Sequence, residues 1–66
     1  MQITVNGKDL EVEEPATVRD LLQQLGIEPI GCAIELNRRI VRKSDIASTQ
    51  IQAGDRIELV TLVGGG

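Results

Sequence analysis

Few residues of this 66-residue chain could do chemistry, either alone or for a partner. The sequence closes with three consecutive glycines at 64–66, contains one thiol at Cys32, and carries an acidic pair at Glu13 and Glu14. It has no histidine, so no base, nucleophile and orienting group can be assembled into a catalytic set. We therefore expect no independent catalyst, no metal site and no tightly bound cofactor.

The glycines at the end of the sequence are the strongest functional candidate. Glycine lacks a Cβ atom, so it fits a narrow channel and adopts almost any φ and ψ. The segment from Thr61 to Gly66 can extend to about 20 Å, at roughly 3.3–3.6 Å per residue. It could deliver the carboxylate of Gly66 into another protein's active site, where Gly65 and Gly64 would be recognised. The alternative is a flexible terminus without a function, or a remnant of cloning.

The carboxylate of Gly66 needs activation before it can accept a nucleophile. An α-carboxyl group is ionised at neutral pH and is then a poor electrophile. Adenylation by ATP is the natural route, but these glycines precede no helix and therefore form no phosphate-binding loop. ATP would thus be used by a separate activating enzyme.

The single thiol has two interpretations. Cys32 could carry sulfur as a persulfide. However, it falls on the inward-facing set of an alternating segment, and free cysteine is among the most buried residue types. No histidine is available to activate it. We favour a core residue.

Two groups of residues are candidates for contact with partner proteins. Basic side chains gather in the middle of the chain: Arg38, Arg39, Arg42 and Lys43. A solvated hairpin is the favoured interpretation, and docking onto an acidic patch of an enzyme is the alternative. Near the glycines, Val60, Leu62 and Val63 either form an apolar partner surface on an open sheet face or are ordinary strand-end residues.

Composition excludes several classes of function. The net charge is −3 and there is no aromatic residue, which argues against binding of nucleic acid. No apolar run is long enough for a membrane span, and the N-terminus does not resemble a signal peptide. With one cysteine and no possible internal disulfide, we expect a cytoplasmic protein of one domain.

The first half of the chain predicts a hairpin and then a helix. Residues 1–12 alternate around Asn6-Gly7, a strong type I′ turn signal, with Val5 facing Lys8 and Ile3 facing Leu10. A helix over 18–25 is predicted from an apolar stripe at one-face spacing. Its signals are Thr17 as N-cap with Asp20 three residues on, then Val18, Leu21, Leu22 and Leu25, and finally Gly26 and Pro29.

The second half predicts strands. Residues 32–36 alternate, Asn37-Arg38 reads as a turn, and a short strand is expected around 40–41. Ser44 is predicted to cap one helical turn that buries Ile46. The last strand is predicted over 56–62, parallel to the first strand and central in the sheet. A folded domain of residues 1–62 would precede a flexible tail of residues 63–66.

This order of elements and the glycine ending resemble the ubiquitin-like β-grasp family, in its bacterial sulfur-carrier branch. The resemblance covers nearly the whole chain, and its most specific parts are AGDRIEL and the glycines. It implies an α+β fold with a mixed four- to five-stranded sheet packed on one helix. Within that branch, the chain is most similar to the sulfur carriers of thiamin thiazole biosynthesis.

The resemblance further implies a cycle of partners. An adenylyltransferase would activate Gly66 with ATP, a cysteine desulfurase would supply sulfur, and thiazole synthase would take it from the resulting thiocarboxylate. The alternatives are the small subunit of molybdopterin synthase, and an interaction or modifier module of the ubiquitin type.

Overall fold

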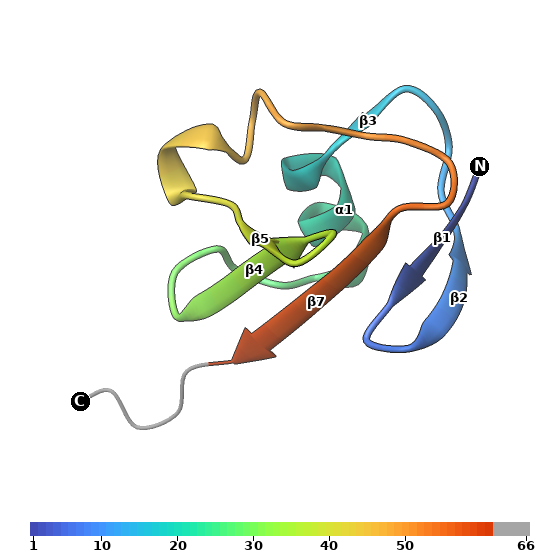
Figure 1. The fold of residues 1–66 in the computed structure, drawn as a ribbon. Coiled ribbons are helices and arrows are strands. Elements are labelled where there is room, and N and C mark those ends of the chain that lie inside the picture. Colours follow the sequence, from blue (N-terminus) through green and yellow to red (C-terminus); the bar gives the residue numbers. More distant parts are fainter. Residues whose placement is uncertain (62–66) are drawn as a thin grey trace.

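The computed structural model describes residues 1–61, in which one helix packs on a five-stranded sheet (Figure 1). The strand order is β2-β1-β7-β4-β5, and a separate two-stranded sheet joins β3 and β6. The strands are β1 (Gln2–Val5), β2 (Lys8–Glu11), β3 (Ala16–Thr17), β4 (Cys32–Leu36), β5 (Arg39–Ile40), β6 (Gln50–Ile51) and β7 (Arg56–Thr61). The helix α1 spans Val18–Leu25. This is the predicted α+β, β-grasp architecture.

The first hairpin forms in the predicted register. Val5 lies opposite Lys8 and Ile3 opposite Leu10. The turn residues Asn6 and Gly7 both have positive φ, at 49° and 81°, as a type I′ turn requires. The alternation therefore places Ile3 in the core, where it is almost fully buried.

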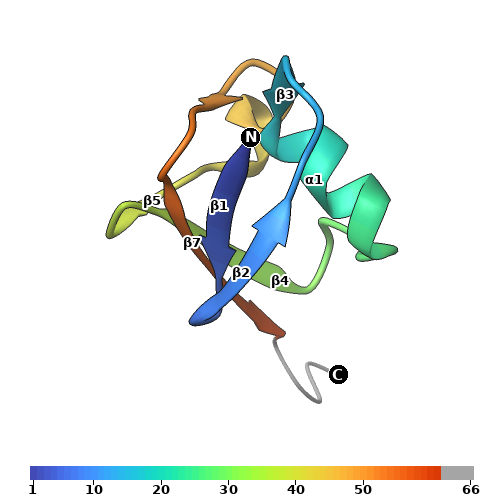
Figure 2. The ribbon, with the colours of Figure 1, turned by 90° about the vertical axis from the view of Figure 1, so that its right-hand side faces the viewer.

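The helix is bounded as the sequence predicted. The Thr17 hydroxyl accepts a hydrogen bond from the Asp20 amide at 3.2 Å, and the Asp20 carboxylate accepts one from the Thr17 amide at 2.9 Å. Gly26 ends the helix in the left-handed conformation, with φ 70°. Figure 2 shows α1 on one side of the sheet, where Leu21 and Leu22 are buried. Burial of such side chains contributes about 1.5–3 kcal/mol each.

The segment after β4 differs from the prediction in one detail. Asn37 and Arg38 form the expected turn, with φ values of 51° and 71°. The helical turn is a 3-10 helix over Lys43–Asp45, and its N-cap is Arg42 rather than Ser44, so the predicted Ser44 cap is wrong. The Asp45 amide donates to the Arg42 carbonyl at 2.8 Å, which closes the turn two residues earlier than expected.

The small sheet of β3 and β6 was not predicted from the sequence. Ala16 pairs with Ile51, and Thr17 pairs with Gln50. The segment just before β6 supplies carbonyl groups to the start of α1, where backbone amides have no partner inside the helix. The Val18 amide donates to the Thr49 carbonyl at 2.9 Å. The irregular stretch before β6 therefore caps the helix as well as connecting the strands, and it carries Ile46 into the core as predicted.

Strand β7 is the centre of the sheet. It runs parallel to β1, with Val5 opposite Ile57, and antiparallel to β4, with Leu36 opposite Ile57. Ile57 is fully buried because it is covered by both neighbours and by the helix layer. The predicted parallel, central placement is confirmed.

Candidate functional site

The site is built at the end of β7, because that strand leads directly into the glycine segment. β4 pairs with β7 as far as Thr61, which lies opposite Cys32. On the other side, the pairing of β1 with β7 ends at Val5, which lies opposite Ile57. The Asn6 side chain then continues this pairing: its Oδ1 accepts from the Leu59 amide at 2.8 Å, and its Nδ2 donates to the Leu59 carbonyl at 3.2 Å.

This anchoring role of Asn6 was missed from the sequence, where the residue was interpreted only as a turn former. The residues are 53 positions apart, so no local pattern connects them. The effect is that β7 is held by Asn6 as far as Leu59 on one side and by β4 as far as Thr61 on the other. The strand end is therefore a firm base for whatever follows it.

The face of the sheet opposite α1, called the outer face below, carries exposed apolar residues at this end. Val60 keeps 55% of its surface exposed and lies opposite Ala33. Ile40 on β5 keeps 73% exposed and lies opposite Glu35. The predicted exposure of Val60 on the open face is thus found.

The other predicted residues of this end, Leu62, Val63, Gly64, Gly65 and Gly66, lie outside the described residues. The expected domain boundary after residue 62 lies there as well.

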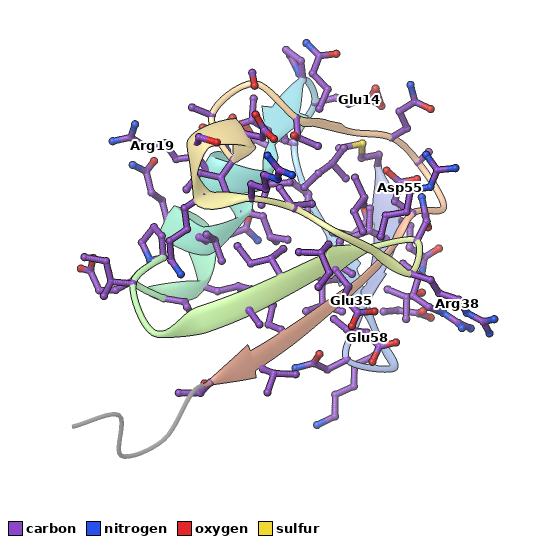
Figure 3. All side chains as sticks on the ribbon, turned by 60° about the vertical axis from the view of Figure 1, so that its left-hand side comes forward. Glu14, Arg19, Glu35, Arg38, Asp55 and Glu58 are labelled. Atoms are coloured by element: carbon purple, nitrogen blue, oxygen red, sulfur yellow. The ribbon has the colours of Figure 1, made fainter. Side chains whose placement is uncertain are left out.

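A pair of like charges stands in the middle of the outer face. Glu35 on β4 lies directly opposite Glu58 on β7, and Figure 3 shows the two side chains next to each other. Within residues 1–61 neither carboxylate makes an ion pair. Like charges in directly opposed positions are destabilising. No sequence pattern predicts this pair, because it depends on the register between two strands that are distant in sequence.

Cys32 is a core residue in this fold. Only 4% of its surface is exposed, and it belongs to the cluster that includes Ile34 and Leu22. Its Sγ atom makes only a weak contact, at 3.7 Å, with the Ala33 carbonyl. The interpretation of Cys32 as a packed side chain is confirmed.

The predicted basic cluster is divided by the fold. Arg38 and Arg39 lie at the turn between β4 and β5, whereas Arg42 follows β5 and precedes the 3-10 helix. Lys43 lines a groove that Arg19 of α1 also lines. All of these side chains are exposed.

The structure adds Arg56 to the turn. The Asn37 amide donates to the Arg56 carbonyl at 2.7 Å, and the Arg56 amide donates to the Asn37 Oδ1 atom at 2.9 Å. Arg56 is the first residue of β7, as predicted from the sequence. Only the pairing of β4 with β7 brings it beside Arg38.

Outside these regions, residues 1–61 offer little for chemistry. A groove of about 530 Å³ lies between α1 and the segment around the 3-10 helix, with Arg19, Gln23 and Lys43 in its lining. Of the basic residues that the sequence offers as partner contacts, Lys43 lines this groove, whereas Arg38, Arg39 and Arg42 do not. Among residues 1–61, no three acidic, cysteine or histidine side chains gather as metal ligands, and no helix has the length and apolarity to cross a membrane.

The arrangement as a whole defines a class of protein. A mixed sheet wrapped around one helix, with its central last strand leading into a glycine ending, is that of a ubiquitin-like β-grasp protein. The family comparison is more specific, since the ThiS family model matches residues 2–66. The chain belongs to the ThiS family.

Individual relatives agree with this assignment. The sulfur carrier protein ThiS of Escherichia coli K12 is 35% identical over 66 residues, which cover 100% of both chains. The crystal structure of the thiamine biosynthesis protein ThiS from Geobacter metallireducens superposes with a TM-score of 0.86, at 32% identity and full coverage of both chains. A protein called thiazole synthase from Paramagnetospirillum magneticum is 36% identical over the same length, but the chain spans only 20% of that relative.

Proposed function

We propose that this protein is a cytoplasmic sulfur carrier in thiamin biosynthesis, and that it carries sulfur on the α-carboxyl carbon of Gly66. The observation that carries the proposal is the match to E. coli ThiS over the full length of both chains, including the glycine ending. The absence of histidine supports the assignment of the carrier as a co-substrate rather than a catalyst.

The proposed chemistry takes place on the tail while enzymes supply the catalytic groups. An adenylyltransferase uses ATP to convert the Gly66 carboxylate into an acyl adenylate and releases pyrophosphate. The persulfide sulfur of a cysteine desulfurase attacks the acyl carbon and displaces AMP, and a thiol reductant then cleaves the resulting acyl disulfide, which leaves a thiocarboxylate and a disulfide of the thiols. Thiazole synthase then takes the sulfur, and the carboxylate is restored. ATP is thus a substrate of the partner, and the carrier binds no cofactor tightly.

The folded body of residues 1–62 and the tail of residues 63–66 would have different roles, for reasons of entropy and packing. Ordering a glycine in a channel costs more than ordering any other residue, on a scale of roughly 1–2 kcal/mol per residue. Gly64 and Gly65 would therefore provide access rather than affinity. Affinity would come from the body, where Val60 stands exposed beside the anchored end of β7, and from its neighbours Leu62 and Val63.

Support for thiazole synthase as one of the partners comes from the P. magneticum relative. There, a stretch similar to this entire chain occupies 20% of a protein called thiazole synthase. A carrier and its sulfur acceptor that work together would gain from being joined, because linkage raises their effective concentration.

The test is a reconstitution followed by intact mass measurement. The protein is incubated with ATP, the adenylyltransferase, the cysteine desulfurase, cysteine and a thiol reductant. We expect a gain equal to sulfur replacing one oxygen, located on the C-terminal peptide and dependent on ATP. A variant without Gly66 is the matched control and should gain nothing. A gain on Cys32 instead would contradict the proposal.

The pathway is tested separately by supplying the loaded carrier to two acceptors. Sulfur transfer to thiazole synthase, and none to the large subunit of molybdopterin synthase, is the expected result. The reverse preference would replace the thiamin assignment with the molybdopterin alternative. Loading without transfer to either would favour a modifier role.

A further inference from the structure

The turn between β4 and β5 holds an arginine in a backbone conformation that normally selects glycine. Arg38 has φ 71°, and its neighbour Asn37 has φ 51°. Two residues of positive φ define the type I′ turn, for which Asn-Gly is the preferred pair. The other hairpin follows that preference with Asn6-Gly7. An L-residue with a Cβ is strained in this region, by about 1–2 kcal/mol relative to the right-handed one.

Hydrogen bonds to β7 impose this conformation on the turn. The Asn37 Oδ1 atom accepts from the Arg56 amide at 2.9 Å, and its Nδ2 donates to the Asp55 carboxylate at 3.0 Å. The Asp55 carboxylate also accepts from the Gln52 amide at 2.7 Å. The turn is thus fixed to the beginning of the central strand, and the Asp55 carboxylate is already engaged in holding it.

Three guanidinium groups surround this fixed turn. We call the exposed residues Arg38, Arg39 and Arg56 the arginine end. Within residues 1–61, none of them makes an ion pair, although the chain has 10 acidic and only 7 basic residues. A strained arginine that stabilises nothing within the described fold is retained at a cost. Observed backbone strain of this kind motivates a functional hypothesis for the residue that bears it.

The register determines which kind of anion would fit. Arg39 lies opposite Leu36, so it belongs to the helix side of the sheet. Arg56 lies opposite Thr4 and belongs to the outer face. Arg38 stands between them at the tip, at one extremity of the molecule in Figure 3. The three residues therefore start from the helix side, the tip and the outer face, and not from one face of the sheet. They match an extended acidic surface and not a single phosphate or carboxylate.

We propose that the arginine end docks onto an acidic surface of thiazole synthase and orients the carrier there. This rests on the proposed function, which names that enzyme as the acceptor. Arg56 and Thr61 are the two ends of β7 and lie about 17 Å apart, at roughly 3.3 Å per residue. A partner that holds the arginine end and also receives the chain beyond Thr61 is therefore contacted at two separated places, which fixes the orientation of the strand.

The test measures association of the full-length carrier with thiazole synthase from the same organism at several salt concentrations. The variant Arg38→Gln/Arg39→Gln is compared with Arg19→Gln/Lys43→Gln, and both change the net charge from −3 to −5. Arg19 lies on α1, far from Arg38 in Figure 3. We expect the first variant to associate about tenfold more slowly at low salt and to lose most of the salt dependence. The second should stay within about twofold of wild type on the same scale.

A second variant separates binding from folding. Arg38→Gly removes the guanidinium group and also the backbone strain, so we expect a higher melting temperature together with slower association. Arg56→Gln tests the residue that joins the arginine end only through folding, and it should slow association with thiazole synthase by about threefold. A variant that unfolds is recognised by circular dichroism, and Arg38→Gly then decides the outcome.

Each result bears on the proposal. Equal effects of the two double variants would show that only net charge matters and would overturn it. Unchanged association of Arg38→Gly would do the same, as would tighter binding of the arginine end to duplex DNA than to the enzyme. The measurement uses carrier with a free carboxylate and, in parallel, carrier whose thiocarboxylate is generated chemically by sulfide cleavage of an intein fusion. Failure of enzymatic loading, which would contradict the proposed function, therefore leaves this test intact.

Discussion

Two asparagine turns flank the central strand β7, and they differ in one residue. Asn6-Gly7 ends β1 and reaches β7 at Leu59, whereas Asn37-Arg38 ends β4 and reaches β7 at Arg56. In both turns the asparagine has positive φ and its side chain accepts a hydrogen bond from a β7 amide, at 2.8 and 2.9 Å. The position after asparagine is glycine in one turn and arginine in the other.

The comparison separates what a turn needs for folding from what it presents to a partner. Both turns need an asparagine, because its short side chain tolerates the left-handed region and substitutes for a missing strand residue. Only one of them uses the residue that relieves strain at the next position. The Asn6-Gly7 turn is thus optimised for the fold, and the Asn37-Arg38 turn gives up some stability to display a charge.

The largest expected effect is the loss of the asparagine anchors. Asn6→Ala should lower the free energy of unfolding by about 2–3 kcal/mol, because it removes both hydrogen bonds to Leu59 and places alanine at positive φ. Asn37→Ala should cost less, about 1–2 kcal/mol, since one of its two bonds goes to the Asp55 side chain, which can reorient toward water, and not to the backbone of β7. Urea denaturation followed by far-ultraviolet circular dichroism measures both, as the chain has no aromatic fluorophore.

A matched control for this prediction is Asn6→Asp, which keeps the acceptor for the Leu59 amide and tolerates positive φ. It should lose about half as much stability as Asn6→Ala. Equal losses at Asn6 and Asn37 would show that the two anchors are equivalent and would remove the distinction drawn above.

Substitutions at the second residue of each turn should change the free energy of unfolding in opposite directions. Arg38→Gly should raise the free energy of unfolding by about 1 kcal/mol, and Gly7→Arg should lower it by about 1–2 kcal/mol. An added Cβ at Gly7 would meet no atom within 4 Å, so the cost there comes from the backbone and not from a clash. Thermal unfolding of the two variants measures the difference.

Gly7→Asn is the control for this exchange, because asparagine tolerates the left-handed region and should lose only a few tenths of a kcal/mol. A destabilising Arg38→Gly would mean that the arginine side chain supports the fold, which would contradict our account of the strained turn.

A smaller effect is expected between the two turns, on the outer face. Glu58→Gln removes the repulsion with Glu35 and should stabilise the fold by about 0.2–0.5 kcal/mol. Asp9→Asn changes the charge by the same amount on the same face, but Asp9 lies opposite Thr4 and should have no such effect. Denaturation in low and high salt tests this, since salt should erase the gain. A similar gain from both variants would point to net charge alone.

The smallest effects are expected at the exposed apolar residues. Ile40→Thr and Val60→Thr should each change stability by less than about 0.5 kcal/mol, because both side chains are already largely in water. Ile34→Val, a change in the core, is the comparison and should cost about 0.5–1.5 kcal/mol. A loss of comparable size at Val60 would mean that this residue packs within the fold and is less available to a partner.

The sequence by itself determined the local elements and their ends. Alternation around Asn6-Gly7 set the first hairpin and its register, and the apolar stripe with the Thr17 and Gly26 caps set α1 at the observed residues. These features depend on residues that are close in sequence: helix neighbours three or four positions apart, and hairpin partners at most nine positions apart, as Gln2 and Glu11 are. Even there, the placement of the 3-10 turn was missed, because its closing bond at Arg42 has no strong sequence signal.

Tertiary structure decided how those elements became surfaces. The bond from Leu59 to Asn6 spans 53 positions and the bond from Arg56 to Asn37 spans 19. The pairing of Ala16 with Ile51 is likewise long-range. Such contacts follow from which strands become neighbours and in which register, and that is settled only when the whole core packs together. For this reason the arginine end and the opposed pair of Glu35 and Glu58 form only when the chain folds. The helix and the first hairpin, in contrast, can be predicted from the sequence.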